Sequence, residues 1–240
     1  MSEIRISVVI PFYNTPRIYF LSCIKSVKRL EPFEIILVDD CSTDKESIQI
    51  AKDSGCIYLK TPYNSGTDSL PFNMGVQKAK GDYICRVDSD DLLLSLPSTL
   101  SYDIYFGNID RVKAPNNVTV EDLILAPRAI MSSSTIKKEL WLKYPYFEES
   151  KIYTDVLCAL RMLYNNHSFT VSPKINYIYR KRKSSIQSSK SNFIHRLTHI
   201  QTVSQFCIDE NIPPKESIKY IQLAMMNLKY GSKSKKFLKK

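Results

Sequence analysis

The sequence lacks several features that would place it in a common class of protein. No apolar stretch approaches the roughly 20 residues needed to span a bilayer, and the N-terminal residues Met1 to Arg5 show no basic-then-apolar leader pattern. Glycine is scarce, at 6 of 240 residues, and the segment Pro11-Phe12-Tyr13-Asn14 after the first apolar run contains none. A glycine-rich phosphate loop is therefore not expected at this point.

Histidine and cysteine groupings with metal-ligand spacing are also missing. The histidines His167, His195 and His199 have no carboxylate or thiol near them in the sequence, so we interpret them as structural. The 6 cysteines are scattered, which predicts reduced cytosolic thiols and no disulfide framework.

Positive charge is concentrated toward the C-terminal end. Residues 171–240 carry 15 Lys and Arg against 3 Asp and Glu, a net charge of +12, whereas residues 1–170 have a net charge of −2. A solvated tail and an anionic membrane surface are both open interpretations, because each Lys near such a surface contributes about 1 kcal/mol. No stacking-aromatic motif accompanies the charge, so we expect no nucleic-acid partner.

The first 90 residues alternate predicted strands and helices. Strands are expected at 6–10, 34–38, 56–60 and 82–87, and helices at 16–30, 42–52 and 71–80. We expect Thr15 to cap the first helix, and Ser42 or Thr43 to cap the second. This alternation, with short connections, predicts parallel strands covered by helices.

The remaining chain is less regular. Residues 92–128 are read as loops with short elements, and 169–180 as extended chain. A strand is predicted at 129–136, and helices at 137–143, 155–164, 192–210 and 214–230.

Two aspartate clusters carry most of the functional information. Asp39 and Asp40 end one apolar run, and Asp88, Asp90 and Asp91 end another. Ligands of open α/β sheets bind at the carboxyl ends of strands. Carboxylates gathered there repel one another, and a divalent cation or the hydroxyls and amides of a ligand would offset that repulsion. The Asp-x-Asp spacing suits a hard cation that also holds a diphosphate.

The ordered set of motifs resembles family 2 glycosyltransferases, which have the GT-A fold. The matching pieces are VVIPFYN at 8–14, EIILVDDCSTD at 34–44, Asn64 with Gly66, Asn73-Met74-Gly75, AKGDYI at 79–84 and VDSDD at 87–91. The resemblance is specific over 6–91 and weaker as far as about 188.

The resemblance implies an α/β fold of the GT-A, Rossmann-like type, with a mixed sheet flanked by helices. We expect a catalytic domain over 1–188, with nucleotide-sugar binding in 1–91 and acceptor binding and catalysis in 92–188. A basic helical extension would follow over 189–240. The expected location is cytoplasmic, with peripheral attachment to the inner face of the cytoplasmic membrane left open.

The resemblance also implies a UDP-sugar donor and a set of residues that bind it. Asp39 and Asp40 would accept hydrogen bonds from the uracil or the ribose, although a turn cap would explain one of the two carboxylates. Arg180 or Arg182 would pair with the diphosphate, unless both belong to a solvated basic loop. The predicted donor-binding residues are Pro11, Tyr13, Asn14, Asp39, Asp40, Asn64, Asn73, Asp88, Ser89, Arg180 and Arg182.

By the same resemblance, Asp88-Ser89-Asp90 holds Mn²⁺ or Mg²⁺. Asp90 is the expected direct ligand, with Asp88 on the ribose or bound to the ion through water, and Asp91 more plausibly caps the next segment.

An inverting transferase needs one general base for the acceptor hydroxyl, and the resemblance assigns Asp155 to that role. The family commonly has Glu-Asp where this chain has Thr154-Asp155, so only the second acid is kept. The alternative interpretation is that Thr154 or Asp155 only caps the helix. Glu148 or Glu149 is the alternative base.

Two departures affect the prediction. Pro71-Phe72 replaces a common Ala-Arg near the nucleotide, and the stretch between Asp90 and Asp155 is short. The expected activity is metal-dependent transfer of a hexose or N-acetylhexosamine to a hydroxyl of a growing glycan, such as lipooligosaccharide or capsule. A nucleotidyl-transfer enzyme on a similar sheet and a non-catalytic nucleotide-sugar-binding homologue or partner subunit are the alternatives.

Overall fold

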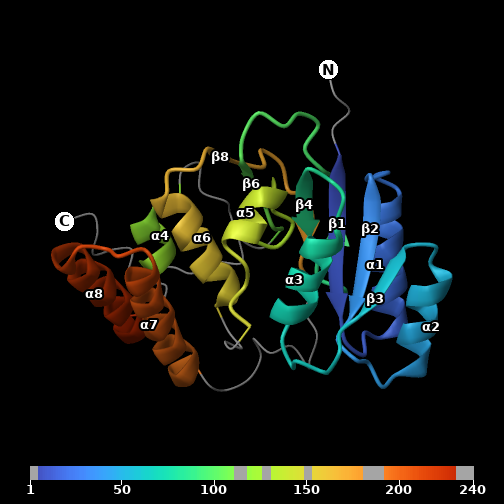
Figure 1. The fold of residues 1–240 in the computed structure, drawn as a ribbon, viewed down its shortest axis with the longest axis horizontal. Coiled ribbons are helices and arrows are strands. Elements are labelled where there is room, and N and C mark those ends of the chain that lie inside the picture. Colours follow the sequence, from blue (N-terminus) through green and yellow to red (C-terminus); the bar gives the residue numbers. More distant parts are fainter. Residues whose placement is uncertain (1–4, 111–117, 126–130, 149–152, 181–191, 231–240) are drawn as a thin grey trace.

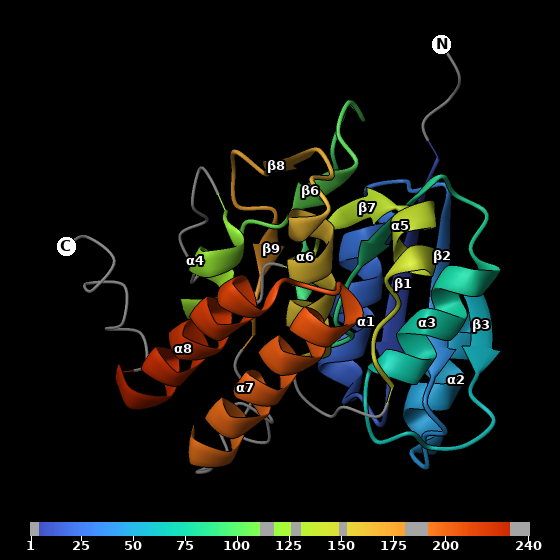
Figure 2. The same ribbon diagram turned by 60° about the vertical axis from the view of Figure 1, so that its left-hand side comes forward.

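A computed structural model describes residues 5–110, 118–125, 131–148, 153–180 and 192–230. The chain forms a central sheet covered on both faces by helices, with a group of helices beside the sheet's far edge (Figures 1 and 2).

The N-terminal half builds the parallel part of the sheet, as the alternation predicts. It consists of β1 (Ile6–Phe12), β2 (Glu34–Asp39), β3 (Ile57–Lys60) and β4 (Tyr83–Arg86), in the spatial order β3-β2-β1-β4. The three pairings between these neighbours are all parallel. The carboxyl ends of the strands therefore meet at one edge, and the two aspartate clusters lie there.

The sheet continues with strands of both directions, so it is mixed. The strand β7 (Thr135–Lys137) runs antiparallel to β4, and β6 (Ile104–Phe106) and β8 (Phe169–Val171) follow it. A separate antiparallel pair joins β5 (Leu92–Leu93) to β9 (Tyr177–Ile178).

Alternate side chains of β1 enter opposite core layers. Val8 and Ile10 pack with α1 (Arg17–Lys28) and α2 (Lys45–Asp53) on one face. Val9 packs on the other face with α3 (Ser69–Lys78) and α5 (Lys138–Lys143). This period of two is that of a strand buried on both faces.

The remaining helices extend the second core layer. They are α4 (Val120–Leu125), α6 (Thr154–Tyr164), α7 (Asn192–Asp209) and α8 (Pro214–Tyr230). Ile124, Leu160, Phe206 and Leu223 belong to the same buried cluster as Val9, so α7 and α8 share the core of the sheet's second face. Among the described residues, no helix combines the length and apolarity needed to cross a bilayer. All 6 cysteines are free thiols.

Several predicted boundaries were wrong. The first strand does not stop at Pro11 but runs to Phe12. The pairing of β1 with β4 ends at Val9. Pro11 lies beyond this pairing, so its lack of an N–H group interrupts no hydrogen bond between these two strands.

The predicted helix caps were also wrong. Pro16 stands at the N-cap position of α1, while the Thr15 hydroxyl bonds the Ser89 hydroxyl at 2.7 Å. Asp44, not Ser42 or Thr43, caps α2, because its carboxylate accepts the Glu46 and Ser47 N–H groups.

Gly75 sets how closely α3 approaches the sheet. A Cβ at this position would lie 2.4 Å from Val9 Cγ1 and 3.1 Å from Val38 Cγ2. Both neighbours are buried β-branched side chains with little rotamer freedom. We predict that Gly75→Ala lowers the free energy of unfolding by about 1–3 kcal/mol through overpacking. Urea denaturation checks this, with the exposed Lys78→Ala on the same helix as control. Equal stability of the two variants would contradict it.

Candidate active site

The loop after β1 connects the two aspartate clusters. Asn14 has a positive φ of 46°, and its amide oxygen accepts the N–H groups of Thr43 and Asp44 at 2.8 Å each. The adjacent Thr15 bonds Ser89 in the second cluster. Of the residues predicted to contact the donor here, Tyr13 is 49% exposed, whereas Pro11 is buried within β1.

Asp39 and Asp40 are both buried at the end of β2 and make different contacts. The Asp39 carboxylate accepts the Ser42 N–H at 2.7 Å and the Tyr58 hydroxyl at 2.9 Å. The Asp40 carboxylate accepts the N–H groups of Ser65 and Gly66, each at 3.1 Å.

Asn64 belongs to the same connection, because its amide donates to the Asp40 backbone carbonyl at 2.8 Å. A turn cap thus accounts for Asp39, and Asp40 organises the 64–66 segment. Binding of the base or ribose by either aspartate stays a prediction.

The second cluster follows β4. Asp88 is partly exposed, and its carboxylate pairs with Arg86 Nη2 at 2.7 Å and accepts the Ser132 hydroxyl at 3.2 Å. Ser89 is buried, while Asp90 is partly accessible. Asp91 is buried, and burial together with the charge of Asp88 raises the pKa of its carboxyl to about 7.

Arg86 lies beneath this cluster, at the last position of β4. The residue is 6% exposed, and Nη2 contacts both Asp68 and Asp88. Its guanidinium carbon is 5.5 Å from the centre of the Tyr146 ring and 6.0 Å from that of Phe72. Burial alone would lower the pKa of Arg86, but the nearby carboxylates, led by Asp88, raise it well above its ordinary value.

Asp155 stands in the first turn of α6, and the charge of Arg86 acts on its carboxyl group. Burial raises the pKa of Asp155 to about 6, the Arg86 guanidinium lowers it, and the charges of Asp68 and Asp88 raise it. The Asp155 carboxylate also accepts the Val156 N–H at 2.9 Å. The preceding Tyr153 is left-handed, with φ 62°.

Two of the three histidines that we interpret as structural have described contacts, and these contacts are with other parts of the protein. His199 of α7 is buried, and its Nε2 lies 2.7 Å from the Ile124 carbonyl oxygen, while its ring lies 5.2 Å from that of Tyr153. His167 lies 3.2 Å from the Tyr144 hydroxyl. The side chain of His195 is outside the described residues.

Arg180 is occupied by contacts with the protein. Its guanidinium donates to the Ser22 hydroxyl at 2.6 Å and the Tyr19 carbonyl at 2.9 Å, and also to the backbone carbonyls of Asp90 and Asp91. Pairing with a diphosphate would require some of these bonds to break. Arg182 lies outside the described residues, as does Glu149.

Asn73 holds the segment that precedes α6. Its amide nitrogen donates to the Tyr146 carbonyl at 2.8 Å and to Glu148 at 2.9 Å, and its amide oxygen accepts the Tyr146 N–H at 3.0 Å. The neighbouring Phe72 is buried against Trp141 and Tyr146. Nucleotide binding by Asn73 therefore stays a prediction, beside an evident role in positioning.

Comparison with known proteins identifies the segment that carries the aspartates. Residues 7–96 match the family described as "Glycosyl transferase family 2". These residues belong to glycosyl transferase family 2. Glycosyltransferase GlyG of Streptococcus pneumoniae serotype 4 is 39% identical over 98 residues, which are 39% of this chain and 32% of GlyG.

A longer alignment exists with a more distant relative. The poly(ribitol-phosphate) β-N-acetylglucosaminyltransferase TarP of Staphylococcus aureus is 25% identical over 225 residues, covering 81% of this chain and 67% of TarP. The chain spans only about a third of GlyG and 17% of TarS, another curated S. aureus relative, so it corresponds to part of these proteins.

Solved structures confirm the fold. S. aureus TarS 1-349 in complex with UDP-GlcNAc has a TM-score of 0.68 at 21% identity, covering 95% of this chain and 72% of that chain. A mannosyltransferase from Pyrobaculum calidifontis, in complex with GDP-Man and Mn²⁺, has a TM-score of 0.60 at 15% identity, covering 96% and 72%. The mixed sheet with flanking helices is the GT-A fold.

The family 2 segment has ligands suited to a divalent ion, although no group of three or more His, Cys, Asp or Glu in the described part of the chain forms a metal centre. A Mg²⁺-type ion bound with a diphosphate needs only one or two protein carboxylates. Asp88 and Asp90 offer hard oxygen ligands and are partly accessible. These two carboxylates therefore fit Mn²⁺ or Mg²⁺ as ligands. Arg86, which pairs with Asp88, would compete with the ion for that carboxylate.

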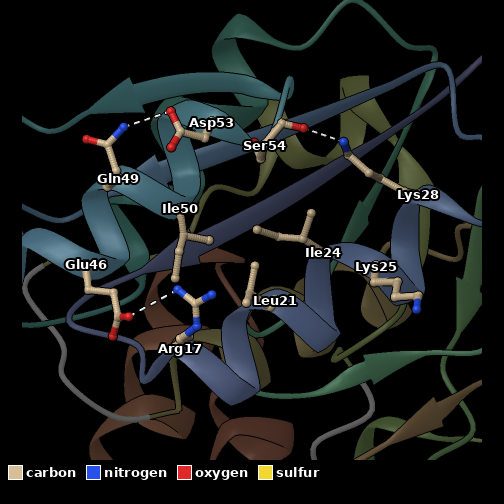
Figure 3. Close-up of a pocket in the computed structure, with 10 residues that line it drawn as sticks. All are labelled: Arg17, Leu21, Ile24, Lys25, Lys28, Glu46, Gln49, Ile50, Asp53 and Ser54. Atoms are coloured by element: carbon tan, nitrogen blue, oxygen red, sulfur yellow. Dashed lines mark hydrogen bonds and ion pairs between the residues drawn. The ribbon is translucent and has the colours of Figure 1, made fainter.

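A cavity of about 560 Å³ lies between α1 and α2 (Figure 3). Its floor is apolar, with Leu21, Ile24 and Ile50, and on its rim Arg17 pairs with Glu46. None of the residues predicted for the site lines this cavity.

Arg86 and Asp68 are absent from the residues predicted for the site. A signal was present, because Arg86 is the charged residue in an otherwise apolar run from Tyr83 to Val87, and a fully buried charge is almost always paired. Its partner Asp68 lies between two motifs of the family and matches neither.

We predict that Asn73→Ala lowers the free energy of unfolding by about 2 kcal/mol, because hydrogen bonds to Tyr146 and Glu148 are lost and a buried carbonyl loses its donor. Urea denaturation measures this, and Gln77→Ala, one turn further along α3 and exposed, is the control. A variant as stable as wild type but with weakened UDP binding would instead assign Asn73 to the nucleotide.

Proposed function

We propose that the chain is the catalytic part of an inverting, metal-dependent glycosyltransferase. It moves a hexose or N-acetylhexosamine from a UDP-sugar to a hydroxyl of a growing surface glycan. The observation that carries the proposal is the position of Asp88, which follows β4, pairs with the buried Arg86 and lies at the edge where the neighbouring parallel strands bring Asp39 and Asp40. The relatives named as glycosyltransferases, and the TarS complex with UDP-GlcNAc, support the donor class.

The residues have separate roles in the proposed reaction. The Asp155 carboxylate takes the proton of the acceptor hydroxyl, whose oxygen attacks the anomeric carbon of the donor sugar. The bond between that carbon and the diphosphate oxygen breaks, and UDP leaves with the bonding electrons. Asp88 and Asp90 would hold a divalent ion, which when bound would stabilise the charge on the leaving diphosphate.

Placement at a membrane belongs to the same proposal. The acceptor class implies work near the cytoplasmic face of a membrane, and the net charge of +12 over 171–240 suits reversible attachment to anionic lipid.

A non-catalytic nucleotide-sugar-binding homologue is the second candidate. Thr154 stands where the family commonly has an acid, and the Asp155 carboxylate bonds the N–H of its own helix. Such a protein would bind the donor with the same aspartates but transfer nothing.

The test combines binding and turnover. We predict that Asp155→Asn retains the thermal stabilisation given by UDP-sugar with Mn²⁺, while sugar transfer falls by about 10²–10⁴-fold. A panel of UDP-sugars with Mn²⁺ or EDTA, followed by release of UDP, provides both measurements. Unchanged turnover would remove Asp155 as the base, and donor binding by wild type without turnover on any glycan would favour the binding protein.

The pH dependence provides an independent test of the base. Because the pKa of Asp155 is raised to about 6, the carboxylate is ionised at neutral pH and becomes protonated as the pH falls. We predict that kcat/KM is level near pH 7.5 and falls about tenfold per pH unit below about pH 6. A profile of kcat/KM measured from pH 4.5 to 8 that stays level would contradict the assignment.

A further inference from the structure

Arg86 has more hydrogen-bonding capacity than its partners use. A guanidinium carries five N–H donors, yet all contacts of Arg86 with carboxylates in the described part of the chain run through Nη2. Nε is buried and meets no acceptor there. An unmatched donor on a buried cation costs free energy, which a ligand oxygen would recover.

The backbone and ring contacts hold Arg86 in place. Its N–H donates to the Ser134 carbonyl at 3.3 Å, and its carbonyl accepts the Ser133 N–H at 2.8 Å. The Tyr146 and Phe72 rings lie against the guanidinium, in the arrangement that favours a cation. The side chain is therefore fixed before any ligand arrives.

The surrounding charge explains why an anion needs this cation. Asp68 and Asp88 contact Arg86, the charge of Asp155 also raises its pKa, and Asp90 and Asp91 lie two and three residues after Asp88. A diphosphate brought to this edge meets strong repulsion unless positive charge offsets it. Arg180, the other described arginine of this region, uses its guanidinium on α1 and on backbone carbonyls.

We propose that Arg86 is a permanent cation of the donor site. Its guanidinium pairs with Asp68 and Asp88 and also binds the diphosphate of the nucleotide, even when no metal ion is bound. The inference rests on the proposed function for the identity of the ligand. It assigns to Arg86 a part of donor affinity that survives removal of the divalent ion.

The experiment is a ligand-detected NMR titration of the full chain with UDP and with uridine, both in EDTA. For Arg86→Gln we expect the affinity for UDP to fall at least tenfold, and the affinity for uridine, which has no phosphate, to change less than threefold. Arg86→Lys, which keeps the charge but loses the fork of donors, should fall in between.

Arg161→Gln is the matched control. Arg161 is also partly buried and ion-paired, to Glu210 at 2.7 Å and Asp209 at 3.8 Å, but it joins α6 to α7 away from the aspartate clusters. This variant should bind UDP like wild type. Should Arg86→Gln fail to fold, as judged by its thermal transition, Arg86→Lys decides, with a loss of UDP affinity of at least threefold expected.

The outcomes separate this inference from the proposed function. Folded wild type that binds UDP only with Mn²⁺ would overturn the role of Arg86 and leave the glycosyltransferase proposal standing. An equal loss of UDP and uridine affinity would overturn it as well, because it indicates general damage to the site. No UDP binding with or without Mn²⁺ would overturn both.

Discussion

Repulsion between carboxylates at one edge of the sheet is the constraint on which the other features of the site depend. Parallel strands bring Asp39, Asp40 and Asp88 to the same edge, and α6 adds Asp155. Such a gathering is stable only where each charge is hydrogen-bonded or paired. Asp40 is satisfied by backbone N–H groups, Asp88 pairs with the buried Arg86, and Asp155 accepts the Val156 N–H. The local fold thus already contains a partial substitute for the positive charge that a metal ion would bring.

The two carboxylate clusters are also joined mechanically. Asn14 fastens the first loop to the start of α2, and Thr15 fastens it to Ser89. Because both residues follow β1, which lies between β2 and β4, the first loop links the two clusters through a few hydrogen bonds. The polar residues of the first loop are therefore explained by the geometry of the site, independently of any direct contact with a nucleotide.

Much of this was predictable from the sequence, and the failures have a common cause. The parallel direction of the first strands and the edge that carries the aspartates follow from local alternation, and the family resemblance implies the GT-A fold. Side-chain partners that are distant in sequence do not follow from either. The sequence predicts that Thr15 caps a helix, and only the folded chain shows that its hydroxyl bonds that of Ser89 instead. Asn73 is predicted to bind the nucleotide, and only the folded chain shows that its amide also contacts Tyr146 and Glu148.

The position of Asp155 depends on the helices that complete the second core layer. Tyr153, two residues earlier, occupies the left-handed region, which costs on the order of 1–3 kcal/mol for a residue other than glycine and persists only where the surroundings over-determine it. The ring of His199, buried in α7, lies against Tyr153 and supplies such a contact. Because α7 and α8 share one buried cluster with α6, their packing bears on the orientation of the candidate base. A helical region that is distant from the family 2 motifs in sequence therefore contributes directly to the geometry of the site.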